Sequence, residues 1–105
     1  MNYIKINEKT FPAVIAGKMQ DSDWDNRESK AITLEMDYAT AMGIFVDGLA
    51  WSIVHQPEEG EAQEYDNADF CVAGDVTDHR DGTVTVKMGK LTDLEEAYEM
   101  MLGGV

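Results

Sequence analysis

The sequence predicts an α+β domain: a mainly antiparallel sheet of about five or six strands, one short internal helix and a C-terminal helix. Three observations favour this class. Apolar and polar residues alternate over much of the chain, which is typical of strands with one buried face. Turn signals such as Asp47-Gly48 separate these runs, and a helix-capping pattern follows the last of them. The length of 105 residues is that of one domain, residues 1–105.

The chain opens with a predicted hairpin. Residues 2–6 alternate, residues 7–10 form a turn, and residues 11–19 are a second extended run. Pro12 lies near the start of that run, where its missing N–H is tolerated at an edge or first strand position. Residues 20–29 are rich in Asp, Asn and Ser, so we expect a loop there.

The middle of the chain combines a strand, a helix and a further strand. Residues 31–36 alternate cleanly and predict a half-buried strand. Asp37 is the expected N-cap of a short helix over residues 38–45. Residues 49–55 alternate again, and this run is the best candidate for a central strand.

A polar loop and a second hairpin come next. Residues 56–64 contain several glutamates and no apolar side to bury, so they predict a solvated loop. Strands at residues 70–76 and 83–88 enclose a turn at residues 78–82. This hairpin is the strongest local prediction in the chain.

The C-terminal helix is predicted from its start signal and its stop signal. Thr92 and Glu95 have the spacing of a capping box, and Gly103-Gly104 ends a helix that reaches about Leu102. The helix has an apolar stripe that consists of Leu94, Ala97, Tyr98 and Met101.

The composition is strongly acidic. Twenty-one Asp and Glu residues stand against eight Lys and Arg residues, which gives a net charge of −13. Such a surface repels nucleic acid and acidic membranes, so neither is an expected partner, and it attracts basic protein clefts. The single cysteine, Cys71, excludes an internal disulfide and fits a reducing compartment. With no long apolar run and no secretion signal, we expect a cytoplasmic protein.

Catalytic signals are weak. Nucleophilic catalysis needs a thiol or hydroxyl held against a base, and the chain offers only Cys71 with His55 or His79. Each of these residues has a structural alternative: a strand-end histidine, a histidine in an acidic turn, and a small core thiol. No nucleophile elbow and no phosphate-binding loop accompany them. We therefore expect a protein that is not an enzyme and has no cofactor.

Two acidic clusters are candidate metal sites. Asp21, Asp23 and Asp25 begin like a calcium loop, but Asn26 replaces the glycine and Ile32 replaces the final glutamate that such a loop needs. A second cluster recurs around a turn, at Asp75, Asp78 and Asp81. It predicts either a site for a hard cation or, more simply, a solvated turn.

The acidic residues concentrate in three segments, which we take as candidate partner-binding surfaces. An acidic surface often serves solubility alone, and the aromatic ring at position 24 is either an interface anchor or part of the core. The candidates are Asp21, Asp23, Trp24, Asp25 and Glu28 in the first loop, Glu58, Glu59, Glu61 and Glu64 in the second, and Asp93, Glu96 and Glu99 on the last helix.

Three segments resemble small acidic proteins encoded by phages and prophages of Gram-positive and gut bacteria: DWDNRES (residues 23–29), WSIV (51–54) and AGDVTDHRDGTV (73–84). That group includes type II anti-CRISPR proteins, several of which mimic DNA, and minor components encoded near tail genes. The resemblance and the charge together imply a non-enzymatic inhibitor that binds a basic nucleic-acid-binding protein in the bacterial host, the type II CRISPR nuclease or its guide complex. The alternative is a phage tail or assembly component that acts through oligomerisation.

Overall fold

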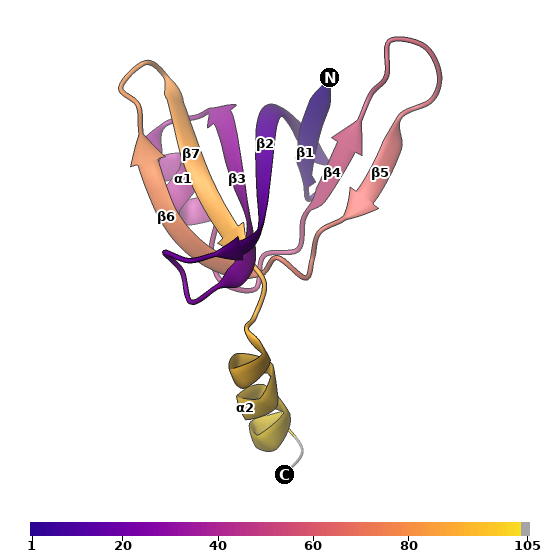
Figure 1. Cartoon of the computed structure of the whole chain (residues 1–105). Helices are drawn as coiled ribbons and strands as arrows, with labels where there is room; N and C mark the ends of the chain where they lie inside the picture. Colours follow the sequence, from indigo (N-terminus) through magenta and orange to yellow (C-terminus); the bar gives the residue numbers. More distant parts are fainter. Residues whose placement is uncertain (104–105) are drawn as a thin grey trace.

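One antiparallel sheet of seven strands forms the body of the protein in the computed structural model, which describes residues 1–103 (Figure 1). The α+β class is confirmed, although the strand number exceeds the expected five or six. The strand order is β5-β4-β1-β2-β3-β7-β6. The strands are β1 (Asn2–Ile6), β2 (Lys9–Asp21), β3 (Arg27–Glu35), β4 (Ser52–His55), β5 (Gln63–Asp66), β6 (Val72–Asp78) and β7 (Thr83–Gly89).

The central strand is β2, which changes its neighbours along its length. Its first residues, as far as Pro12, pair with β1, and its pairing with β3 begins at Ala13. Pro12 therefore lies where the strand passes from one neighbour to the other, a position that tolerates a missing N–H. The sheet opens into two arms on either side of β2, like a V (Figure 1).

The expected central strand at residues 49–55 is confirmed only in part. Only Ser52–His55 is extended, as β4, and β4 lies between β1 and β5 near one edge. The alternation that predicts a longer strand depends largely on Trp51, which precedes β4 and is buried. Its indole nitrogen donates a hydrogen bond of 2.9 Å to the carbonyl oxygen of Phe70, so the ring fills the core from a loop.

The additional strand, β5, lies partly in the expected loop at residues 56–64. It pairs with β4 along its whole length, and all four of its side chains are exposed. Because only its backbone takes part in the sheet, no alternation of apolar residues marks it in the sequence.

The expected loop at residues 20–29 is also shorter than predicted. β2 continues to Asp21 and β3 begins at Arg27, so the turn itself covers residues 22–26. The flanking strand ends bury polar side chains, Asp21, Arg27 and Ser29, which a search for apolar periodicity does not detect.

The core lies on one face of the sheet and includes the residues that alternation had selected. Ile32 and Leu34 of β3 are buried there, as are Val84, Val86 and Met88 of β7. The predicted hairpin of β6 and β7 is confirmed, with β6 shifted by two residues to Val72–Asp78.

Two helices complete the fold. Helix α1 (Tyr38–Ile44) packs on β6 and β7, and the side chain of Asp37 accepts a hydrogen bond from the backbone nitrogen of Thr40, as expected of an N-cap. Helix α2 (Asp93–Gly103) extends away from the sheet (Figure 1). The expected stop at Gly103-Gly104 falls partly outside the described residues, since α2 includes Gly103 and Gly104 is not described.

The turn between β1 and β2 generates a testable prediction. Asn7 and Glu8 both adopt left-handed backbone angles, with φ of 51° and 69°. Glycine accepts such angles without a Cβ penalty, so we expect Glu8→Gly to raise the free energy of unfolding by about 0.5–1 kcal/mol. Urea denaturation measures this change. The control is Lys9→Gly, which places glycine in the adjacent strand and should lower stability instead.

Candidate functional site

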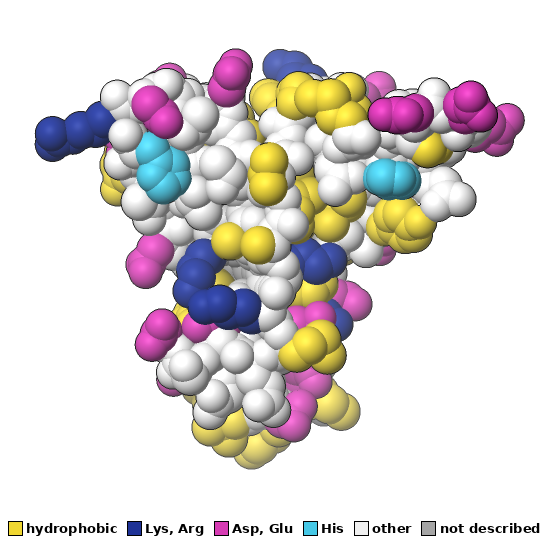
Figure 2. Space-filling model, turned by 45° about the horizontal axis from the view of Figure 1, so that its top comes forward, with side chains coloured by type: hydrophobic (Ala, Val, Ile, Leu, Met, Phe, Trp, Pro, Cys, Tyr) yellow, Lys and Arg dark blue, Asp and Glu magenta, His cyan; other side chains and the backbone are white. Residues whose placement is uncertain are grey.

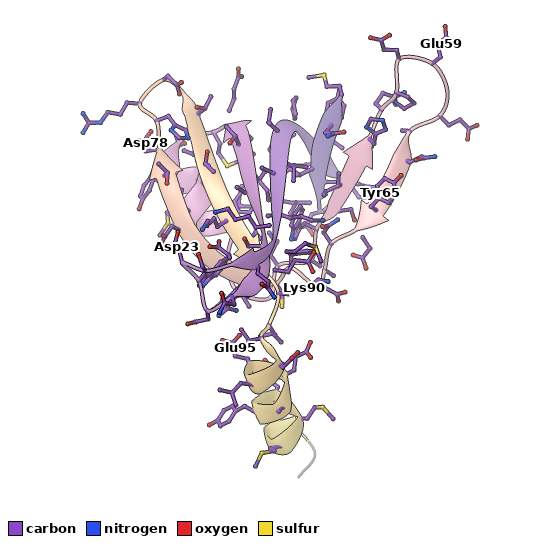
Figure 3. All side chains as sticks on the ribbon, in the orientation of Figure 1. Asp23, Glu59, Tyr65, Asp78, Lys90 and Glu95 are labelled. Atoms are coloured by element: carbon purple, nitrogen blue, oxygen red, sulfur yellow. The ribbon has the colours of Figure 1, made fainter. Side chains whose placement is uncertain are left out.

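The three acidic segments do not form one continuous surface. The loop that carries Glu59 lies at the far end of the β4 and β5 arm, whereas Asp23 and Glu95 lie near the base of α2 (Figure 3). The turn at residues 22–26 and the start of α2 come together, because Asp25 and Asp93 line the same hollow of about 370 Å³. The structure therefore pairs the first and third predicted segments and separates the second.

Asp21 is a structural residue, and its assignment as a partner-binding residue is wrong. Its side chain is buried, with 1% of the residue exposed. The carboxylate accepts hydrogen bonds from Lys87 Nζ (2.6 Å) and Ser29 Oγ (3.1 Å). The hydrogen bond from Lys87 is the main cause of a lowered pKa of Asp21, because it favours the charged form. In the folded chain this carboxylate is therefore not presented to a partner.

Arg27 connects the sheet to helix α2. Its side chain is 4% exposed and donates to both carboxylate oxygens of Glu95, at 2.8 and 3.2 Å. The same guanidinium donates to the carbonyl oxygen of Lys90 at 3.0 Å. These bonds from Arg27 are the first cause of a lowered pKa of Glu95. A buried guanidinium thus fixes the chain on both sides of the α2 start.

Glu95 also completes the predicted capping box. Its Oε1 accepts a hydrogen bond from the backbone nitrogen of Thr92 at 2.9 Å, and Thr92 Oγ1 accepts one from the backbone nitrogen of Glu95 at 3.2 Å. One side chain therefore caps the helix and binds Arg27.

Trp24 is half-buried on the outer face of the sheet. Arg27 Cζ lies 4.7 Å from its ring centroid, and Lys87 Nζ lies 6.0 Å from it. The ring also rests on two glycines: a Cβ on Gly74 or on Gly89 would lie 2.7 or 2.8 Å from its atoms. These contacts show that Trp24 folds back onto the sheet, but it is half-buried and is not part of the core cluster. The signal that sequence reasoning missed was a glycine inside each of two strands, which marks a close approach.

Several basic residues around this end are bound within the molecule, whereas Lys18 on β2 is exposed. Lys90 Nζ lies 3.1 Å from Glu28, so Glu28 is half-buried in an ion pair. Lys30 binds the side-chain oxygen of Asn67, and Lys30 and Lys90 both lie over the ring of Phe70, at 4.3 and 5.0 Å. The exposed carboxylates at this end outnumber the exposed basic side chains. We call the exposed set the acidic end, and it consists of Asp23, Asp25, Asp93, Glu96 and Glu99.

The mid-chain loop forms a separate acidic surface. Glu58, Glu59 and Glu61 are exposed at the tip of the β4 and β5 arm. Glu64, on β5, pairs with Lys5 at 3.1 Å, so its charge is partly balanced. This loop is the natural comparison for the acidic end, because it carries similar charge in a different place.

A larger, mainly apolar groove of about 750 Å³ lies between β1, β2 and β3. Phe11, Ala13, Ile15 and Leu34 contribute to its lining, and Glu35 is its one titratable side chain. Figure 2 shows yellow hydrophobic side chains over this open end of the sheet and again around α2 at the bottom. The groove lacks the paired acid and base side chains of a hydrolytic site.

The candidate catalytic and metal-binding residues are dispersed. His55 Nδ1 lies 2.7 Å from Asn2 Oδ1, His79 Nε2 lies 2.7 Å from Thr85 Oγ1, and the two histidines lie on opposite sides of the molecule (Figure 2). Asp78 and Asp81 accept backbone hydrogen bonds within their own turn. Within residues 1–103, no three His, Cys, Asp or Glu side chains are grouped to hold a metal ion.

Neither helix of the described chain combines the length and the apolar character needed to cross a bilayer. Comparison of the chain with protein-family models, with curated proteins and with solved structures gives no match. Functional inference therefore depends on the surfaces described above.

The packing of Trp24 predicts that replacement of Gly89 by alanine lowers the stability of the fold. Gly89→Ala places a Cβ 2.7 Å from Arg27 Cδ and 2.8 Å from the Trp24 ring, so we expect a loss of about 1–3 kcal/mol in the free energy of unfolding. The matched control is Gly43→Ala in α1, where the new Cβ meets no atom within 4 Å. That variant should gain about 0.5–1 kcal/mol from helix propensity. Equal effects of the two substitutions in urea denaturation would contradict the packing.

The lowered pKa of Asp21 predicts acid sensitivity. An unfolded Asp has a pKa near 3.8, and the folded value is lower, so this carboxylate stabilises the fold fully above 3.8. The stabilisation is lost as the pH falls from there through the folded pKa. Urea denaturation between about pH 2.5 and 6 should therefore give a shallower acid dependence for Asp21→Asn than for the wild type. Asp23→Asn removes an exposed carboxylate nearby and should keep the wild-type dependence.

Proposed function

We propose that this chain is a non-enzymatic inhibitor that binds a basic nucleic-acid-binding enzyme of a bacterial host. The type II CRISPR nuclease with its guide RNA is the partner we favour. The acidic end would occupy the basic channel that otherwise receives DNA, with carboxylates in place of phosphates. The site of action is then the host cytoplasm.

The acidic end is the observation that supports this proposal. Its five carboxylates come from two segments far apart in the sequence, and Arg27 fixes these segments against each other through Asp25 at 3.5 Å and Glu95 at 2.8 Å. A rigid carboxylate array loses less conformational entropy on binding than a flexible acidic tail does. The net charge of −13 adds long-range attraction to any basic cleft.

The sheet edges favour a second candidate function, that of a phage tail or assembly component. β5 and β6 end the sheet, and the side chains of β5 are all exposed. Open edges of this kind accept strands from neighbouring copies. This function requires self-association, which light scattering on the isolated chain detects directly.

The proposed inhibition predicts salt-sensitive binding to the guide-loaded nuclease. We expect the association rate to fall at least about tenfold between about 50 and 500 mM NaCl, because screening weakens electrostatic steering. We also expect excess protein to prevent the nuclease from binding its target duplex. Surface-bound nuclease and a fluorescent target duplex are suitable probes.

A pair of charge-matched variants locates the binding surface. Asp25→Asn, Asp93→Asn and Glu96→Gln, combined at the acidic end, should weaken binding by about 10- to 100-fold. Glu58→Gln, Glu59→Gln and Glu61→Gln, combined in the mid-chain loop, remove the same charge and should change binding by less than about threefold. Absence of binding by the wild type, or binding that is indifferent to salt, would rule out the mimicry.

A further inference from the structure

Within residues 1–103, the apolar stripe predicted on α2 packs against no other element. Leu94 is 81% exposed, Tyr98 is 63% exposed and Met101 is 73% exposed. The helix stands away from the sheet (Figure 1), and the contacts that fix it, from Arg27 and Thr92, lie at its first turn. An exposed row of large apolar side chains on a helix is typical of a docking surface.

The sequence spacing of the three apolar residues places them on one side of the helix. At about 100° per residue, Leu94, Tyr98 and Met101 fall within a narrow sector of the helix circumference. A shallow hollow of about 470 Å³ lies beside them, lined in part by Leu91 and Glu99. The stripe is thus a continuous surface, about two helical turns long.

The charges beside the stripe identify the chemistry of its occupant. Helix α2 carries Asp93, Glu95, Glu96 and Glu99 and no basic residue. Glu95 is neutralised by Arg27, whereas Asp93 and Glu99 lie on either side of the stripe, one step before Leu94 and one step after Tyr98. A complementary surface has an apolar floor and basic residues along both rims.

We propose that the stripe formed by Leu94, Tyr98 and Met101 docks as a helix into an apolar groove, rimmed by lysine or arginine, on the basic enzyme. This inference rests on the proposed function and adds an apolar anchor to it. Charge alone gives fast but weak association, and buried apolar anchors supply most of the binding energy of an interface. The acidic end would steer the encounter, and the stripe would hold the complex.

A second copy of the chain fits the stripe less well. Two α2 helices packed through their stripes would place Asp93 and Glu99 of each against the carboxylates of the other, with no basic residue in either helix. Each copy also carries a net charge of −13. Electrostatic repulsion therefore opposes self-association at this surface and favours a basic partner.

The test leaves the charge unchanged and removes the apolar stripe. Leu94→Gln, Tyr98→Gln and Met101→Gln, combined, keep residues with good helix propensity and should weaken binding to the guide-loaded nuclease by at least about 100-fold. Circular dichroism and urea denaturation verify that the fold is retained. Met101→Gln alone should weaken binding about fivefold or more. Its matched control is Met100→Gln, the same substitution at a neighbouring methionine that is 77% exposed but lies outside the stripe, and binding should change by less than about twofold.

Each outcome has a distinct meaning. If the triple variant binds like the wild type while neutralisation of the acidic end weakens binding, the docking inference is wrong and the proposed function stands. If the wild type does not bind the nuclease at all, both are wrong. If light scattering shows a wild-type dimer that the triple variant converts to a monomer, the stripe joins two copies and the inference is also wrong.

Discussion

The buried guanidinium of Arg27 is the interaction on which the functional end of this protein depends. Burying a charge is costly unless it is paired, and Arg27 meets that requirement with a carboxylate, a carbonyl oxygen and an aromatic face. Glu95 and Lys90 lie around the start of α2, and Trp24 lies in the turn at residues 22–26. Because all three groups bind the same guanidinium, Arg27 determines where α2 leaves the sheet and how the turn at residues 22–26 is oriented.

Much of the fold is visible in the sequence wherever one face of an element is buried. Alternation identified the strands around Ile32 and Val86, and the Asp37 cap located α1, because these features depend on neighbours within a few residues. β5 was missed because its side chains face solvent and only its backbone binds β4. The strand order was inaccessible for a related reason, since the pairing of β1 with β4 joins residues about fifty positions apart.

For the candidate site, the sequence predicts the overall acidity but not the position and role of each carboxylate. The excess of carboxylates is a property of the sequence, but the roles of individual carboxylates are not. Asp21 and Asp23 have similar local contexts, yet only Asp21 faces Ser29 and Lys87 across neighbouring strands, and this makes it a buried structural residue. The α2 stripe was recognised as apolar from its spacing, whereas its exposure follows from how Arg27 directs the helix away from the core.

The place of β1 within the sheet has a consequence for synthesis on the ribosome. β1 emerges before the other six strands of the sheet, and it ends up between β2 and β4. A nascent chain can form the β1, β2 and β3 meander early, but the second edge of β1 remains unpaired until residues 52–55 have left the exit tunnel. Over that interval the growing chain exposes the backbone of residues 2–5 on an open strand edge, which is a template for association with other nascent chains.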